Sequence, residues 1–197
     1  MVSVEPGCDN LIRKTGRTPK RLAIKLPICN FDAKTGILCA NCESRLQRGE
    51  ITKADVEASK ALIRLADKFP ELARSRLRRA FEVAGSYLLE FEQSDIPGIR
   101  SSTSIYVELE AALKGRVWVV GGGTSERRFL EDVFFPGKVV TVTTVWLSDG
   151  GKRTKVIVPD RRSERRYGEF EKLRNAVKLA RGIELLVETE REALPRA

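Results

Sequence analysis

Residues 29–42 read Cys29-Asn30-Phe31-Asp32-Ala33-Lys34-Thr35-Gly36-Ile37-Leu38-Cys39-Ala40-Asn41-Cys42 and hold three of the four cysteines of this 197-residue chain. Cys39 and Cys42 form a C-x-x-C pair, a spacing that directs two thiolates to one point, as half of a tetrahedral zinc site requires. The turn-forming residues before Cys39 predict that one strand folds back on another, with Cys29 on the first arm. The stretch therefore predicts a ribbon-like zinc knuckle.

The fourth ligand of this site is predicted to be Cys8, because four thiolates close a structural zinc site. The predicted cofactor is thus Zn²⁺ bound by Cys8, Cys29, Cys39 and Cys42. Asp32 and a side chain of a partner are alternatives for the fourth position. The cysteines are alternatively reduced and buried, or a redox C-x-x-C, although the βαβ context of a redox pair is not visible. Disulfides are less favoured because nothing in the chain resembles a secreted protein.

Basic residues are in excess, with a net charge of +9 and a pI of about 9.6. They form three clusters: Arg13, Lys14, Arg17, Lys20, Arg21 and Lys25; Arg74, Arg76, Arg78 and Arg79; and Lys152, Arg153, Lys155, Arg161, Arg162, Arg165 and Arg166. Clustered positive charge on a chain with an ordinary hydrophobic content predicts a polyanion-binding protein. The alternative is a basic surface without a specific partner, and the high Arg, Lys and Glu content also fits a thermophile.

Several functional classes are disfavoured by what the sequence lacks. The chain contains no histidine, which removes the commonest acid–base group at neutral pH, so we do not expect an enzyme. No apolar run approaches the length of a membrane span, and the first residues do not resemble a signal peptide. We therefore expect a cytosolic protein that does not bind a membrane.

The pattern of apolar residues predicts alternating helices and strands. A capping box at Thr52-Lys53-Ala54-Asp55 predicts a helix up to Pro70, and a second helix is expected over residues 71–83. The remaining predictions are a strand at 87–92, a loop at 95–102, a helix from Thr103 to Gly115, a strand at 116–120, a flexible turn at Gly121-Gly122-Gly123, a helix ending before Pro136, a hairpin with strands at 138–147 and 152–158, a helix at 167–181 and a strand at 183–187. Trp118 and Trp146 are expected in the core. No internal repeat is visible beyond a weak helix–strand echo near the C-terminus.

Four stretches of the sequence resemble a known family. The order strand, loop, helix, strand over residues 87–120 resembles the centre of a KH domain of the NusA-like type, in which a G-x-x-G loop between two helices grips the RNA backbone. Gly98-Ile99-Arg100-Ser101 occupies the loop position but lacks the second glycine. Residues 26–42, the stretch Arg128-Phe129-Leu130-Glu131-Asp132-Val133-Phe134-Phe135-Pro136 and the hairpin around Asp149-Gly150 are similar to archaeal NusA-like proteins with a cysteine knuckle.

The resemblance implies an RNA-binding factor of the archaeal transcription or translation apparatus. The predicted fold is α+β, with a basic arm and zinc knuckle at 1–49, a helical segment at 50–86, a KH-like domain with its hairpin at 87–160, and a last helix and strand at 161–197. The predicted RNA-binding residues are Arg13, Lys14, Arg17, Lys20, Arg21, Gly98, Arg100, Ser101, Lys152, Arg153, Arg161, Arg162, Arg165 and Arg166. The alternative function is a protein–protein adaptor whose knuckle docks on RNA polymerase or the ribosome.

Overall fold

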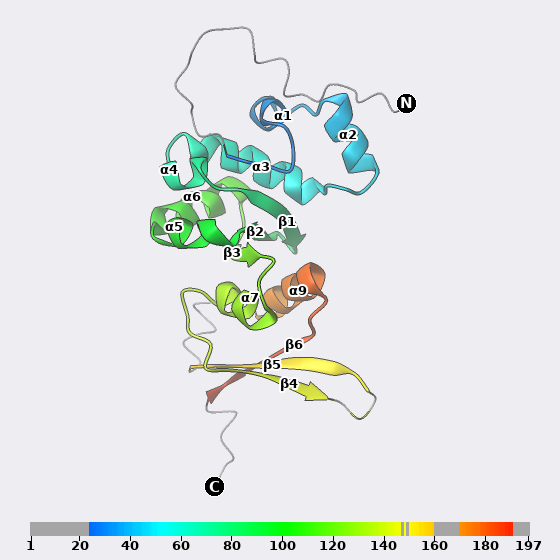
Figure 1. Cartoon of the computed structure of the whole chain (residues 1–197), viewed down its shortest axis with the longest axis vertical. Coiled ribbons are helices and arrows are strands. Elements are labelled where there is room, and N and C mark those ends of the chain that lie inside the picture. The colour runs from blue at the N-terminus through cyan, green and yellow to red at the C-terminus, as the bar shows by residue number, and fades with distance from the viewer. Residues whose placement is uncertain (1–23, 147, 149, 160–169, 191–197) are drawn as a thin grey trace.

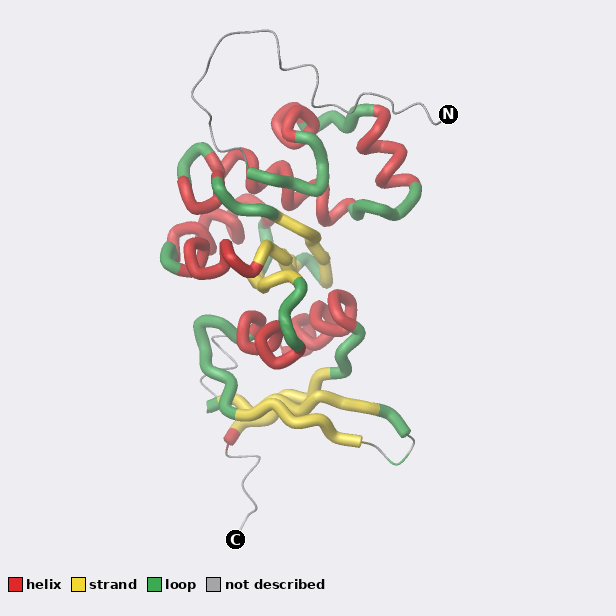
Figure 2. The backbone as a smooth tube through the Cα atoms, viewed as in Figure 1, coloured by secondary structure: helices red, strands yellow, loops and turns green. Residues whose placement is uncertain are grey.

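The structure is a computed structural model that describes residues 24–146, 148, 150–159 and 170–190. Helices surround the cysteine-rich stretch at the N-terminal end of this part, and two mixed sheets of three strands follow (Figures 1 and 2). This arrangement confirms the predicted α+β class. None of the helices that the structure describes is long and apolar enough to span a membrane.

The cysteine-rich stretch is helical, so the predicted ribbon-like knuckle is wrong in its local structure. Helix α1 (Asn30–Thr35) occupies the first arm, and α2 (Ala40–Gln47) begins directly after Cys39. Gly36 does not turn one strand back on another. It ends α1 in the left-handed conformation, with φ of 79°, which is a common way for a helix to end.

Helix α3 (Lys53–Ala66) begins at the predicted capping box, which the structure confirms. The Thr52 hydroxyl accepts a hydrogen bond from the backbone N–H of Asp55, and the Asp55 carboxylate accepts one from the backbone N–H of Thr52. The other oxygen of Asp55 accepts a 2.6 Å hydrogen bond from the backbone N–H of Ala80. Asp55 therefore both completes the cap of α3 and connects this helix to the first sheet.

The predicted helix over residues 71–83 is wrong. Only the short helix α4 (Pro70–Ala73) forms there, and strand β1 (Leu77–Val83) follows. It pairs antiparallel with β2 (Ser86–Glu92) through a two-residue turn in which Ala84 and Gly85 both have positive φ. Such a turn matches the twist of a hairpin, so the residues before and after it pair as antiparallel strands.

The first sheet is completed by a strand that follows two helices. The chain runs through η2 (Gln93–Asp95), α5 (Ile96–Arg100) and α6 (Thr103–Leu113) to β3 (Val117–Gly122), which pairs parallel with β2. Gly121 and Gly122 belong to this strand and are buried, contrary to the predicted flexible turn. A Cβ atom on Gly121 would lie 1.6 Å from the side-chain oxygen of Gln93, so close packing requires glycine there.

The second sheet has the same strand order and directions as the first. Its elements are α7 (Glu126–Val133), β4 (Thr141–Trp146), β5 (Lys152–Val158), α9 (Phe170–Arg181) and β6 (Leu185–Thr189). β4 and β5 form the predicted antiparallel hairpin, and β6 pairs parallel with β5, as β3 does with β2. The chain therefore contains two units of related topology, residues 53–122 and 126–189, where the sequence indicates only a weak echo.

Two hydrophobic cores place the units against each other. One face of the first sheet packs with α3 and α6, and its other face, which includes Leu88, Trp118 and Val120, packs with residues of α7, α9 and the second sheet. Figure 1 shows α7 and α9 between the two sheets. The core position predicted for Trp118 is confirmed, but Trp146 is 72% exposed at the end of β4, so its predicted burial is wrong.

Candidate metal centre and two sheet-edge grooves

Four potential metal ligands converge between α1 and α2. The ligand atoms of Cys29, Asp32, Cys39 and Cys42 all lie within 4.8 Å of one another. Cys29 is the N-cap of α1 and Asp32 follows three residues later; Cys39 is the N-cap of α2 and Cys42 follows three residues later. Because an N-cap residue and the third helical residue lie on the same side of a helix start, each helix presents two ligands to one point.

Asp32 takes the position that the cysteine pattern assigns to Cys8. It is fully buried, and its Oδ2 accepts a 2.9 Å hydrogen bond from the backbone N–H of Cys39. Its Oδ1 is buried without a hydrogen bond from any residue that the structure describes. A buried carboxylate oxygen without a partner is costly, and a cation held by this oxygen and the three sulfurs would satisfy it.

The protonation of the cluster reflects its burial. Burial raises the pKa of the Cys29 thiol well above its usual range and that of Cys42 to about 11, and the carboxylate of Asp32 raises both further. Burial alone would raise the pKa of Asp32, but interactions with the Cys39 backbone N–H and with the cysteine thiols lower it below its ordinary value. The Asp32 carboxylate is thus stabilised by hydrogen bonds from the Cys39 backbone N–H and the cysteine thiols.

The donor set fits a zinc ion. Three thiolates and one carboxylate oxygen are four ligands of the types that Zn²⁺ takes in tetrahedral sites. Two contacts fix the segments that carry these ligands: the Arg45 guanidinium donates a 2.8 Å hydrogen bond to the carbonyl of Pro27, and Ala33 is buried in the first core. Cys8 lies outside the described residues, and its role stays a prediction. The repeated spacing, Cys29 to Asp32 and Cys39 to Cys42, is the signal in the sequence that could have identified Asp32.

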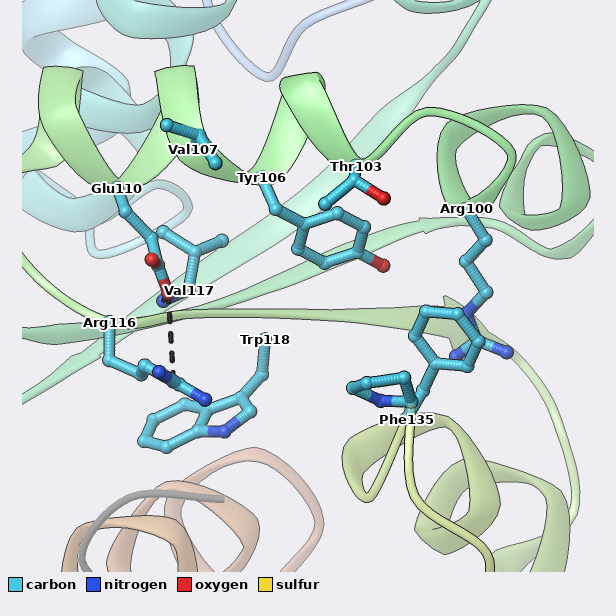
Figure 3. A pocket seen from close by; sticks show the side chains of 10 residues that line it. Arg100, Thr103, Tyr106, Val107, Glu110, Arg116, Val117, Trp118 and Phe135 are labelled. Atoms are coloured by element: carbon cyan, nitrogen blue, oxygen red, sulfur yellow. Dashed lines mark hydrogen bonds and ion pairs between the residues drawn. The ribbon is translucent and has the colours of Figure 1, made fainter. Parts of the chain in front are cut away.

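A groove of about 280 Å³ lies between α6 and the start of β3 and is closed at one end by the Phe135–Pro136 segment after α7. Figure 3 shows the rings of Tyr106, Trp118 and Phe135 around this space. The hydroxyl of Tyr106 is buried and makes no hydrogen bond with another described residue, and burial raises its pKa. The groove is therefore largely aromatic, with one unsatisfied donor.

Charged side chains line the rim of this first groove. Arg116 and Glu110 form an ion pair at 3.6 Å, drawn as the dashed line in Figure 3. Glu110 also accepts a hydrogen bond from the backbone N–H of Val117, and Arg100 donates one to the carbonyl of Val119. These side chains occupy part of the outer edge of β3, the edge strand of its sheet.

A second groove, of about 240 Å³, lies between α9 and the start of β6. Its lining residues Arg174, Asn175, Lys178, Glu184, Leu185 and Leu186 stand 68 residues after Tyr106, Val107, Glu110, Arg116, Val117 and Trp118 of the first groove, position for position. The ion pair recurs with its charges exchanged, since Lys178 lies 3.0 Å from Glu184. The two units therefore carry equivalent grooves with different chemistry: the first is aromatic and the second is basic.

The predicted RNA-binding residues have different positions relative to these grooves. Gly98 lies within α5, so the loop predicted at this position is helical, and the exposed Ser101 is the C-cap of α5. The Arg100 guanidinium, in contrast, lies mostly buried against Asp132. Lys152 and Arg153 are about half exposed on β5, and Arg153 lines the second groove. The other predicted residues lie outside the described part of the chain: Arg13, Lys14, Arg17, Lys20, Arg21, Arg161, Arg162, Arg165 and Arg166.

Comparison with known proteins finds similarity at the level of structure alone. No family model matches the chain, and no curated protein matches it. The crystal structure of APE1850 superposes on this chain with a TM-score of 0.45 and 13% sequence identity, over 66% of this chain and 96% of that chain. A similarity of this size does not assign a function.

Proposed function

We propose that this protein binds single-stranded RNA along the two sheet-edge grooves and is not an enzyme. The observation that carries the proposal is the pair of grooves at equivalent positions of two units with the same topology. In both units a helix, a sharp turn and a parallel edge strand form the groove, as in the KH domains that the sequence resembles. The net charge of +9 adds the attraction that a polyanion requires.

Stacking and charge supply the affinity in this proposal, each mainly from one groove. In the first groove, the ring of Tyr106 and the face of Phe135 that Arg100 does not cover are offered to unpaired bases. In the second groove, Arg153, Arg174 and Lys178 offer three cations against the single carboxylate of Glu184. Because Glu110, Arg100 and Asp132 already bond to the edge of β3, we expect little recognition of bases by the strand backbone.

The metal centre has a structural role in this proposal. Bound zinc would be held by Cys29, Asp32, Cys39 and Cys42, and it would supply folding free energy to α1 and α2. These short helices contribute few residues to the first core, so a metal crosslink would compensate for their limited burial. The resemblance to NusA-like proteins suggests that the RNA is a nascent transcript or ribosomal RNA in the cytosol of an archaeon.

A second candidate function has one observation in its favour. Phe31 and Ile37, which lie on either side of Asp32 in the metal-binding stretch, are 65% and 75% exposed. Exposed apolar side chains on a metal-ordered segment suit docking on a protein, such as RNA polymerase or a ribosomal protein. Salt separates the two functions, because RNA affinity falls steeply with salt whereas apolar docking does not.

The experiment that tests RNA binding places a negative charge in each groove. Val107 is 62% exposed on α6, and Asn175 is its equivalent on α9. Val107→Glu and Asn175→Glu should each weaken binding to a single-stranded RNA pool without affecting folding. The matched control is Ala112→Glu, an exposed position of α6 outside the groove lining. Equal affinity of all four proteins, wild type included, would refute binding in the grooves.

A further inference from the structure

Trp146 is the most exposed aromatic side chain on the second sheet. It is the last residue of β4, with 72% of its surface in water, whereas the chain's other tryptophan, Trp118, is 6% exposed. Leaving an indole ring in water forgoes a large burial energy, so an isolated exposed tryptophan commonly marks a contact with a partner. The packing of the described residues gives no structural reason for a tryptophan at this position.

One cation accompanies this ring on the neighbouring strand. Lys152 is the direct partner of Trp146 across the β4–β5 ladder, so both side chains leave the sheet on the same face. The next residue, Arg153, lines the second groove. β4 itself carries no charged residue from Thr141 to Trp146. The ring thus shares its face of the sheet with one cation, Lys152, whereas Arg153, as the next residue of β5, leaves the opposite face.

The ion pairs of these cations leave them available to a ligand. Lys152 lies 3.7 Å from Glu126, and Arg153 lies 3.4 Å from Glu184, with each cationic side chain about half exposed. Ion pairs with this exposure contribute little stability, and a phosphate can replace the carboxylate at small cost. Positive charge beside a free aromatic face is the combination used by proteins that bind single-stranded nucleic acid.

We propose that Trp146 stacks on one unpaired base and that Lys152 contacts an adjacent phosphate, which forms a separate subsite beside the second groove. This inference rests on the proposed RNA-binding function and extends it to a surface outside both grooves. The ligand is a single-stranded nucleic acid, because its phosphate complements Lys152 and any base supplies a stacking face. An apolar protein segment would cover the ring but would leave Lys152 without a role.

Affinity for a single-stranded RNA oligonucleotide that spans the groove and the subsite tests this inference. Trp146→Ala should weaken binding roughly 5- to 160-fold, the range for the loss of one stacked base, and Trp146→Phe should retain most of the affinity. Lys152→Ala should make the salt dependence shallower by about 0.7 in log–log slope, as expected for one lost phosphate contact. Val140→Ala is the matched control, because Val140 is 45% exposed just before β4, at the other end of the strand.

Tryptophan emission gives a second readout of the same contact. RNA should quench the tryptophan fluorescence of the wild-type protein more than that of Trp146→Phe. An oligonucleotide with an abasic site at the stacked position should remove this difference. If Trp146→Ala and Lys152→Ala bind like the wild type while Val107→Glu and Asn175→Glu bind weakly, the subsite is refuted and groove binding stands. If the wild type binds no RNA, both proposals fall. The thermal midpoint of each variant shows whether it is folded.

Discussion

The guanidinium of Arg100 lies 2.9 Å from Oδ1 of Asp132 and connects the end of α5 with α7. It also donates hydrogen bonds to the backbone carbonyls of Val119 and Asp132, and it lies over the ring of Phe135 at 4.4 Å. The carboxylate of Asp132 is fully buried and accepts a further hydrogen bond from the backbone N–H of Gly121. Arg100, predicted from its loop position to contact RNA, thus has a structural role at the junction of the two units.

Removal of Arg100 should therefore destabilise the protein. Arg100→Ala leaves the buried carboxylate of Asp132 without its closest cation, and we expect a loss of about 3 kcal/mol in the free energy of unfolding. The control is Arg127→Ala, which removes an exposed ion pair with Glu131 and should cost less than about 0.5 kcal/mol. Urea denaturation measures both. If Arg100→Ala is as stable as the control, the Arg100 side chain is not required for stability and is available to contact RNA.

Asp32 should be a metal ligand. Asp32→Ala should lower the zinc content of the purified protein well below one ion per chain, because the site loses a ligand and the remaining three cannot close a tetrahedron. Asp32→Cys should retain zinc, since it supplies a fourth thiolate. Cys8→Ser is the informative control and should retain zinc. Metal analysis that shows zinc in Asp32→Ala but not in Cys8→Ser would identify Cys8 as the fourth ligand.

The number of protons released on zinc binding is an independent test of whether Asp32 or Cys8 is the fourth ligand. The raised pKa of Cys29 and of Cys42, the latter to about 11, means that both thiols carry protons at pH 7 in the metal-free protein, whereas Asp32 is already ionised. Zinc binding at pH 7 should therefore release about three protons, one for each coordinating thiol, and zinc affinity should rise with pH. Titration calorimetry in buffers of different ionisation enthalpy counts these protons. A release of about four would indicate that Cys8 is a ligand.

Gly98→Ala should test whether RNA approaches helix α5 closely, without perturbing the fold. A Cβ atom on Gly98 would meet only the Cβ of Glu71, at 4.0 Å, and Gly98 does not have a positive φ. Because Gly98 lies within α5, the free energy of unfolding should rise by about 0.4 to 1 kcal/mol, and a loss of RNA affinity would report close approach of the RNA backbone to this glycine. Because the second glycine of the family motif is absent, we expect the loss to be smaller than for Val107→Glu. A larger loss would mean that α5 is a principal RNA contact.

Regular elements with a clear burial pattern could be predicted from the sequence. The helix after Thr52 follows from its capping box and apolar period, and the β4–β5 hairpin follows from its β-branched run. Strand β1 could not be predicted in the same way, because exposed Arg78, Arg79 and Glu82 interrupt its apolar residues. Its conformation is set by the tertiary pairing with β2, which local propensity does not encode.

The grooves and the metal site are harder to predict because their signals lie in spacing rather than in residue type. Glu110 and Lys178 occupy equivalent positions with opposite charges, so the internal repeat is not visible as sequence similarity. Asp32 is only an alternative ligand in the sequence, because the pattern of cysteines favours a site of four thiolates. Arg100 lies in a segment that resembles an RNA-binding motif, and only the structure places its guanidinium against Asp132.

The most direct test of RNA binding in the grooves is a map of the contacts themselves. Single-stranded RNA that contains 4-thiouridine would be crosslinked to the whole chain, and the crosslinked peptides would be identified by mass spectrometry. We predict crosslinks to residues 103–118 around the first groove and to residues 174–186 around the second. Crosslinks confined to the metal-binding stretch at residues 29–47, with none in either groove, would contradict the account.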